Sequence, residues 1–328
     1  MRRLISIVLA VILAAGGIGF WWINHTLSLG TPVVDLSIEP GTSPRGVAQD
    51  AVDAGVLTSP RLLYWWFRLS GQSRQIKAGS YELQGEVTPR SLLSKLVRGE
   101  EALRAVALVE GLTFKQFRQV LLKAEQLAPD TQGLAPDLIM QKLGQPGISP
   151  EGRFYPDTYT YTKGSSDLAV LKRALHAMQR HLDAAWQLRA ADSPLKAPDE
   201  LLTLASIIEK ETGRAADRPM IASVFTNRLR IGMPLQTDPT VIYGLGAAFD
   251  GNLRKRDLLA DTPFNTYTRG GLPPTPIALP GLASLRAAVR PDATKALYFV
   301  ARGDGSSVFS ASLAEHNRAV NQYQRAQR

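Results

Sequence analysis

The chain has 328 residues, no cysteine and a formal net charge of +9. The lack of thiols excludes disulfides, cysteine nucleophiles and cysteine-ligated zinc, and a composition that is 45% hydrophobic excludes a disordered tail and predicts two globular domains. The basic residues are dispersed and no nucleic-acid-binding motif accompanies them, so we predict no nucleic acid as a partner. An anionic lipid surface or an anionic cell-wall polymer would suit this charge equally well.

Residues 4–23 form an apolar segment without a charge, long enough to span a bilayer as a helix. Arg2 and Arg3 precede it and place the N-terminus, residues 1–3, in the cytoplasm, while Trp21 and Trp22 close it. A cleaved signal peptide is the alternative, because small residues occur at 14–16, but the apolar run continues past them. We favour a retained anchor.

A small mixed module follows, from about residue 31 to 127. Residues 33–38 alternate as in a strand, and Ser–Pro or Thr–Pro pairs predict helices that begin near residues 44, 60 and 89. The helix from Pro60 carries five large apolar side chains within residues 62–67, more than a lone helix exposes. It is either core or a docking surface, and core is the favoured interpretation. Extended segment, glycine turn and helix recur over residues 104–122, a weak internal repeat.

Residues 128–150 are predicted to connect this module to the second domain, with a short helix around 136–143. The next segment, EGRFYPDTYTY (151–161), has the composition of a ligand-lining loop or of a well-packed turn. Ser166 and Asp167 then cap a long helix whose apolar side chains follow the i+3/i+4 pattern of a core helix.

The segment LLTLASIIEKET (201–212) predicts an apolar helix that ends in two carboxylates. On a helical wheel Glu211 falls beside Leu204 and Ile207, so its pKa should be raised by desolvation, as a general acid near neutral pH requires. On the same wheel Glu209 lies far from Glu211, so the two acids do not share a face of the helix. A salt-bridged helix end is the simpler interpretation of the same pattern.

The remaining elements are a helix opened by Pro219, two loops rich in Pro, Gly and Thr, a hairpin around RGDGSS, and a last helix capped by Ser312 and Glu315. Long polar loops are often functional. Their side chains suit the hydroxyls and apolar faces of a sugar, and the predicted substrate contacts are Gln236, Thr237, Asp238, Tyr243, Asn265 and Tyr267, with Asp157 from the earlier segment.

The motifs LASIIEKET, ASVFTNRLRIGMPLQTDPTVIYGLG, NTYTRGGLPPTPIALPG and LYFVARGDGSSVFS occur in this order behind the anchor. In this the chain closely resembles the endolytic murein transglycosylases of the MltG (YceG-like) family over nearly its whole length. The resemblance implies a bacterial inner-membrane enzyme with a periplasmic catalytic domain, which cleaves nascent peptidoglycan strands internally and has membrane-bound penicillin-binding protein synthases as possible partners. It also implies that Glu211 is the catalytic acid.

A lytic transglycosylase needs one carboxyl group, which serves first as acid and then as base. A hydrolase needs a second carboxylate, for which Asp238, Asp157 and Glu209 are the candidates, although we rank orientation or structure first for all three. Neither reaction type requires a cofactor, and the four histidines lack metal-ligand spacing, so we predict no cofactor and no metal.

The predicted fold is α+β: a single N-terminal transmembrane helix (4–23), a small LysM-like βα module (31–127), and a larger helix-rich catalytic domain (151–328) with short strands and a hairpin. Two other functions stay open. One is a non-catalytic peptidoglycan-binding scaffold of the cell-wall synthesis machinery. The other is a Ser/Lys hydrolase using Ser206 and Lys210, which are i,i+4 neighbours on a helix face that points away from the apolar stripe.

Overall fold

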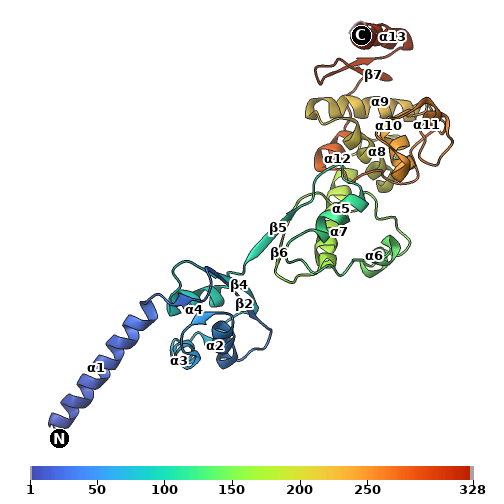
Figure 1. Cartoon of the computed structure of the whole chain (residues 1–328). Coiled ribbons are helices and arrows are strands. Elements are labelled where there is room, and N and C mark those ends of the chain that lie inside the picture. Colours follow the sequence, from blue (N-terminus) through green and yellow to red (C-terminus); the bar gives the residue numbers. More distant parts are fainter. Residues whose placement is uncertain (1, 326–328) are drawn as a thin grey trace. The chain divides into compact units, whose positions relative to one another are not determined.

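The computed structural model describes residues 2–325 and divides the chain into two compact units (Figure 1). Unit 1 comprises Met1–Arg104 with Thr160–Gly164, and unit 2 comprises Ala105–Tyr159 with Ser165–Arg328. This division falls earlier than the predicted end of the first module at residue 127. The physical reason is local packing, since Phe114 and Phe117 after the boundary pack against Phe154 of unit 2.

The chain begins with helix α1 (Arg2–Asn24), whose stretch Ile5–Asn24 has a mean hydropathy of 2.1. By length and composition it can cross a membrane, which agrees with the predicted anchor. Its last turns contact the rest of unit 1, since Trp22 packs against the core and Arg90 lies over the ring of Phe20.

Unit 1 is built on the antiparallel pair β2 (Val33–Ile38) and β4 (Gly79–Gln84), and strand β2 matches the predicted range. A second, shorter pair joins β1 (Ser28–Leu29) to β3 (Val56–Leu57). The helices α2 (Pro44–Asp53), α3 (Pro60–Leu69) and α4 (Pro89–Arg98) begin at prolines, as predicted, and a 3-10 turn covers Ser73–Gln75.

The prediction that helix α3 is core is only half correct. Leu63 and Phe67 are fully buried, whereas Leu62 and Trp65 on another face are about half exposed. The helix is more apolar than one buried face requires, so the excess lies at the surface.

Unit 2 surrounds helix α8 (Pro198–Glu211), in which every side chain from residue 201 to 208 is buried. It packs against α7 (Asp167–Gln187), α9 (Arg218–Arg230) and α12 (Leu282–Val289). The other helices of the first half are α5 (Phe114–Leu122) and α6 (Pro136–Lys142), which lies where a short helix is predicted. Strands β5 (Leu103–Ala107) and β6 (Thr158–Thr162) pair, and β5 with α5 gives the strand, turn and helix of the predicted repeat.

The predicted hairpin is confirmed as the antiparallel strands β7 (Tyr298–Ala301) and β8 (Ser307–Ser310). A capping box of Ser312 and Glu315 opens α13 (Leu313–Val320), also as predicted, and a π-helical turn follows at Asn321–Arg325.

The two segments predicted as loops are more structured than expected. The first contains α10 (Asp238–Leu245), with Pro239 in its first turn, and the stretch between the two contains α11 (Lys255–Leu259). Short 3-10 turns occur at Ala215–Asp217 and Gly246–Ala248. The Asp–Pro pair was the signal for α10, because proline is favoured in a first helical turn.

Candidate active site

Glu211 is the last residue of α8, where the apolar helix ends and Thr212 turns to extended backbone. Its Oε2 accepts a hydrogen bond of 2.7 Å from Oγ1 of Thr237. Burial raises the pKa of Glu211, and the negative charge of Asp238 raises it further. The Thr237 hydrogen bond and the charge of Arg228 act in the opposite direction. The carboxyl group is therefore poised to retain a proton above the usual range of a glutamic acid.

Thr237 is held in place by two further threonines. Its backbone N–H donates to Oγ1 of Thr266 at 3.1 Å, and the hydroxyls of Thr240 and Thr266 are 2.9 Å apart. Thr240 also donates to the carbonyl of Thr237 at 2.8 Å. All three side chains are buried. This network fixes the start of α10 against the segment around Thr266 and aims the Thr237 hydroxyl at Glu211.

Three of the other residues predicted to contact substrate lie beside Glu211 and Thr237, at or near the surface. The hydroxyl of Tyr267 donates a 2.6 Å hydrogen bond to Oδ1 of Asp238, and Asp238 is exposed. Gln236 is exposed and adopts a positive φ of 49°, which is uncommon for a residue other than glycine. Its backbone N–H donates to the carbonyl of Thr266 at 3.0 Å, so the strained backbone is fixed by the same segment. The structure therefore brings Gln236, Asp238 and Tyr267 together with Thr237.

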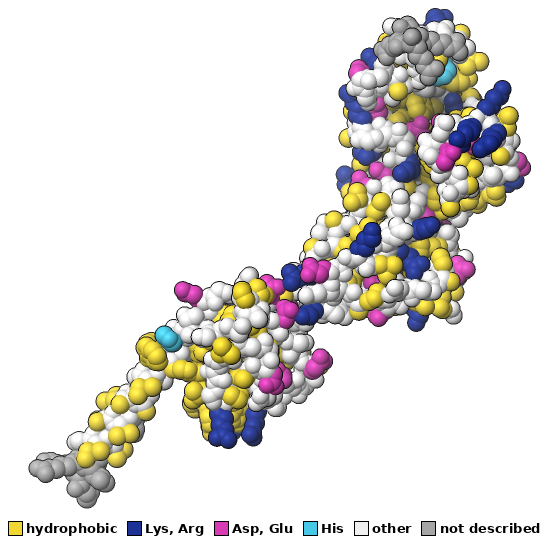
Figure 2. Space-filling model, viewed as in Figure 1, with side chains coloured by type: hydrophobic (Ala, Val, Ile, Leu, Met, Phe, Trp, Pro, Cys, Tyr) yellow, Lys and Arg dark blue, Asp and Glu magenta, His cyan; other side chains and the backbone are white. Residues whose placement is uncertain are grey.

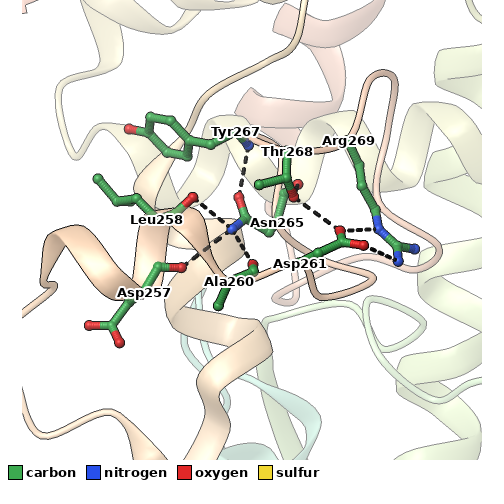
Figure 3. A network of polar contacts seen from close by, with 8 residues as sticks. All are labelled: Asp257, Leu258, Ala260, Asp261, Asn265, Tyr267, Thr268 and Arg269. Atoms are coloured by element: carbon green, nitrogen blue, oxygen red, sulfur yellow. Dashed lines mark hydrogen bonds and ion pairs between the residues drawn. The ribbon is translucent and has the colours of Figure 1, made fainter.

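Asn265 occupies the same loop but is fully buried (Figure 3). Its Nδ2 donates to the backbone carbonyls of Asp257, Leu258 and Ala260, the shortest at 2.6 Å. Its Oδ1 accepts from the backbone N–H of Tyr267 at 2.9 Å. The side-chain amide is thus occupied in tying the loop to the end of α11, and Asn265 positions Tyr267.

Glu209 points to a different part of unit 2, as the helical wheel predicts. Its Oε2 accepts from the backbone N–H of Gly281 at 2.9 Å, and its Oε1 lies 3.4 Å from Nη2 of Arg218. The two acids of α8 therefore have separate partners. Glu209 has the contacts of a structural carboxylate that joins α8 to the start of α12.

Glu151 is a carboxylate that the sequence analysis does not single out. Its side chain is buried, and it accepts hydrogen bonds from the backbone N–H of Phe114 at 2.9 Å and from the hydroxyl of Tyr243 at 3.1 Å. Burial raises the pKa of Glu151 to about 7. The only sequence signal was its place at the head of the aromatic segment 151–161.

Glu151 and Tyr243 line a pocket of about 820 Å³ that also includes Lys210, Pro239 and Ile277. Two of these residues, Lys210 and Pro239, are the chain neighbours of Glu211 and Asp238. The pocket therefore adjoins the ends of the two helices that carry the Glu211 group. Tyr243, a predicted substrate contact, faces this pocket.

Asp157 lies in a different group of side chains. It is exposed and accepts a hydrogen bond from the backbone N–H of Thr158 at 2.7 Å. Burial raises the pKa of Tyr155 and Tyr159, and the charge of Asp157 raises both further. The geometry does not bring it together with the threonine network around Glu211.

The Ser206 and Lys210 pair does not form a catalytic dyad. Ser206 is fully buried, donates to the carbonyl of Thr203 at 2.7 Å and accepts from the backbone N–H of Ile277. Nζ of Lys210 instead bonds to the carbonyl of Gly111 at 3.2 Å. A serine nucleophile needs both access and an adjacent base, and Ser206 has neither here.

Several known proteins are similar to this chain over most of its length. The model of the YceG-like family matches residues 36–322. The chain is 32% identical over 307 residues to the endolytic murein transglycosylase of Bacillus subtilis (strain 168), covering 88% of this chain and 84% of that protein. It is 27% identical to the endolytic murein transglycosylase of Streptococcus pneumoniae serotype 2, covering 97% of this chain but 64% of that longer protein.

A crystal structure of a YceG-like protein from Listeria monocytogenes is also similar, with a TM-score of 0.54 and 30% sequence identity. The match covers 87% of this chain and 98% of the Listeria chain. Sequence and structure thus agree over most of the length, and this chain is a member of the YceG-like family.

Proposed function

We propose that this chain is an endolytic murein transglycosylase, which cuts MurNAc–GlcNAc β-1,4 bonds within peptidoglycan strands, with Glu211 as its acid and base. The Bacillus and Streptococcus relatives carry that name. The observation that supports Glu211 is its position: a partly buried carboxyl group with a raised pKa, held by Thr237 among the polar side chains of two loops.

The reaction requires one group that exchanges a proton. Protonated Glu211 gives its proton to the glycosidic oxygen as the bond from that oxygen to C1 of MurNAc breaks. The resulting carboxylate then accepts the proton of the MurNAc C6 hydroxyl, whose oxygen bonds to C1 and closes a 1,6-anhydro ring. Glu211 ends protonated again, and no water is consumed. Because the nucleophile belongs to the substrate, proximity supplies much of the rate.

The environment of Glu211 suits both halves of this cycle. Desolvation favours the protonated acid before cleavage, while Thr237 and Arg228 favour the carboxylate that forms after it. Asp238 and Glu209 are engaged by Tyr267 and by Arg218 with Gly281, respectively, which supports orienting or structural roles for both.

Substrate contacts are proposed for Gln236, Asp238 and Tyr267 beside Glu211, and for Tyr243 in the adjoining pocket. Thr237 and Asn265 act in this proposal as positioning residues. The pocket beside Lys210 and Pro239 gives room for part of the strand beyond the bond that is cut.

In this proposal the enzyme lies in the bacterial inner membrane, with α1 as a single-pass anchor, residues 1–3 in the cytoplasm and the chain after α1 in the periplasm. In unit 1 the order β2, α2, β3, α3, β4, with β2 and β4 paired antiparallel, supports a LysM-like glycan-binding module. Peptidoglycan strands are the proposed partner, together with membrane-bound penicillin-binding protein synthases that make them.

The test is mass spectrometry of the fragments released from uncrosslinked peptidoglycan strands by the full-length protein and by Glu211→Gln. We expect wild type alone to release fragments ending in 1,6-anhydroMurNAc. Reducing ends would instead indicate hydrolysis and a second catalytic carboxylate. Strand binding without cleavage by either protein would favour a non-catalytic scaffold.

A further inference from the structure

Helix α3 of unit 1 exposes an apolar stripe. Leu62, Trp65 and Leu69 are 49%, 55% and 79% exposed, respectively. Their spacing of three and then four residues places them on one face of the helix. Leu63 and Phe67, on another face, are fully buried in the unit 1 core. The exposed stripe is therefore surplus to what folding of the unit requires.

The charged residues on α3 and in the segment that follows it are all positive. Between Asp53 and Glu82 the sequence has no acidic residue, but it contains Arg61, Arg68, Arg74 and Lys77. On the helical wheel Arg61 and Arg68 lie beside Trp65, and both side chains are exposed. In Figure 2 hydrophobic and basic side chains meet at the edge of unit 1 where Figure 1 places α3. Apolar, tryptophan and arginine side chains without acids are typical of helices that lie in a membrane interface.

Unit 1 is held close to the anchor by direct packing. Trp22 of α1 packs against the unit 1 core, and Leu27, three residues after the end of α1 at Asn24, is part of that core. The backbone N–H of Leu27 donates to the carbonyl of Val87 at 2.7 Å. No flexible linker therefore separates α1 from the rest of unit 1, and a membrane that α1 crosses would reach the surface of the unit.

We propose that α3 is a second membrane contact, which lies in the headgroup region of the bilayer that α1 spans. Leu62, Trp65 and Leu69 insert among the upper parts of the acyl chains, while Arg61 and Arg68 bind anionic headgroups. The contact fixes how unit 1 is turned relative to the membrane surface. It depends on α1 spanning a bilayer and is independent of the proposed catalysis by Glu211.

The absence of cysteine in the chain makes a direct test possible. Leu69→Cys in the full-length protein is labelled with a nitroxide and reconstituted into vesicles of phosphatidylglycerol and phosphatidylethanolamine. Its accessibility to oxygen, which enriches in the bilayer, and to a water-soluble nickel chelate is measured by power saturation. Asp130→Cys, an exposed position of unit 2, is the aqueous control.

We expect nickel accessibility at residue 69 to be lower than at residue 130 by roughly 5-fold or more, with oxygen accessibility in the opposite order, because an interfacial helix buries its apolar face below the headgroups.

Adding Arg61→Glu with Arg68→Glu should raise nickel accessibility at residue 69. The charge-matched pair Lys142→Glu with Lys172→Glu, exposed in unit 2, should leave it unchanged. Equal nickel accessibility at residues 69 and 130 would overturn the proposal and leave the stripe as a surface for a protein partner. Because the readout is accessibility, a failure of the transglycosylase proposal would not affect it.

Discussion

The hydroxyl of Thr237 donates a 2.7 Å hydrogen bond to the carboxylate of Glu211, across 26 residues of sequence. The bond joins the end of α8 to the start of α10. It is stronger when Glu211 is charged, and so it limits how far burial raises the pKa of that carboxyl group. The proton affinity of Glu211 thus depends on a residue from another helix.

Thr237→Val is expected to raise the pKa of Glu211 further, because the carboxylate loses a hydrogen bond and gains no other. The alkaline limb of the kcat/KM profile for strand cleavage should move to higher pH. The rate at neutral pH should fall roughly 10-fold, because Glu211 becomes a weaker acid toward the glycosidic oxygen and its carboxylate is less stabilised as the bond breaks. Thr237→Ser retains the hydroxyl and should restore the wild-type profile. If the alkaline limb of Thr237→Val stays at the wild-type pH and the rate is lower at every pH, Thr237 contributes packing and does not set the pKa of Glu211.

Glu211→Gln should abolish cleavage, by roughly 10³-fold or more, while leaving the protein folded. The side-chain amide of the variant still offers an oxygen to Thr237. The pKa of Glu211 is raised in the folded state, so wild type loses stability as pH rises through that pKa, because the folded state then has to accommodate a desolvated charge. The variant has no such loss. Urea unfolding should show it to be at least as stable as wild type at neutral pH, whereas a large destabilisation would make its inactivity uninformative.

Glu209→Ala should have the opposite effect: it should lower stability and leave catalysis largely intact. Removing this carboxylate leaves Arg218 and the N–H of Gly281 without their partner, which should destabilise unit 2 by about 2–4 kcal/mol. Glu209→Gln keeps an acceptor for Gly281 and should cost less. The folded fraction of Glu209→Ala should still cleave strands within roughly 3-fold of the wild-type rate, as expected when a residue contributes packing and not chemistry. A stable but inactive Glu209→Ala would identify Glu209 as a second catalytic carboxylate.

Glu151 should make stability depend on pH. Its pKa is raised from 4.5 to about 7, so between those values the folded state holds a proton that the unfolded state has lost. Stability should therefore fall as pH rises from about 4.5 to about 7, by roughly 2–3 kcal/mol in total. Urea midpoints of wild type and Glu151→Gln, measured across this range, should diverge, with the variant the flatter of the two. Parallel curves would show that Glu151 ionises as readily in the folded chain as in the unfolded one.

Local signals in the sequence determined most of the secondary structure. The alternation of residues 33–38 gives strand β2, and the Ser312 and Glu315 capping box opens α13, because each pattern involves neighbours that interact wherever the chain lies. The same reasoning separates Glu211 from Glu209, since the angle between two positions on one helix is fixed by its period of about 3.6 residues. Helix α10 was missed because polar turn-forming residues surround the single signal of an Asp–Pro pair.

The tertiary structure decided which side chains meet. Thr237 reaches Glu211, Tyr243 reaches Glu151, and Asn265 turns inward to three backbone carbonyls. In the sequence Thr237, Tyr243 and Asn265 looked equally suited to a ligand. The tertiary structure also decided that Leu62, Trp65 and Leu69 of α3 stay exposed while Leu63 and Phe67 are buried. The type of a side chain determines what it is able to bind. Which partner it meets depends on how helices that are far apart in the sequence pack together. The free energy of that packing comes from burial shared among many residues, so no short segment of sequence contains it.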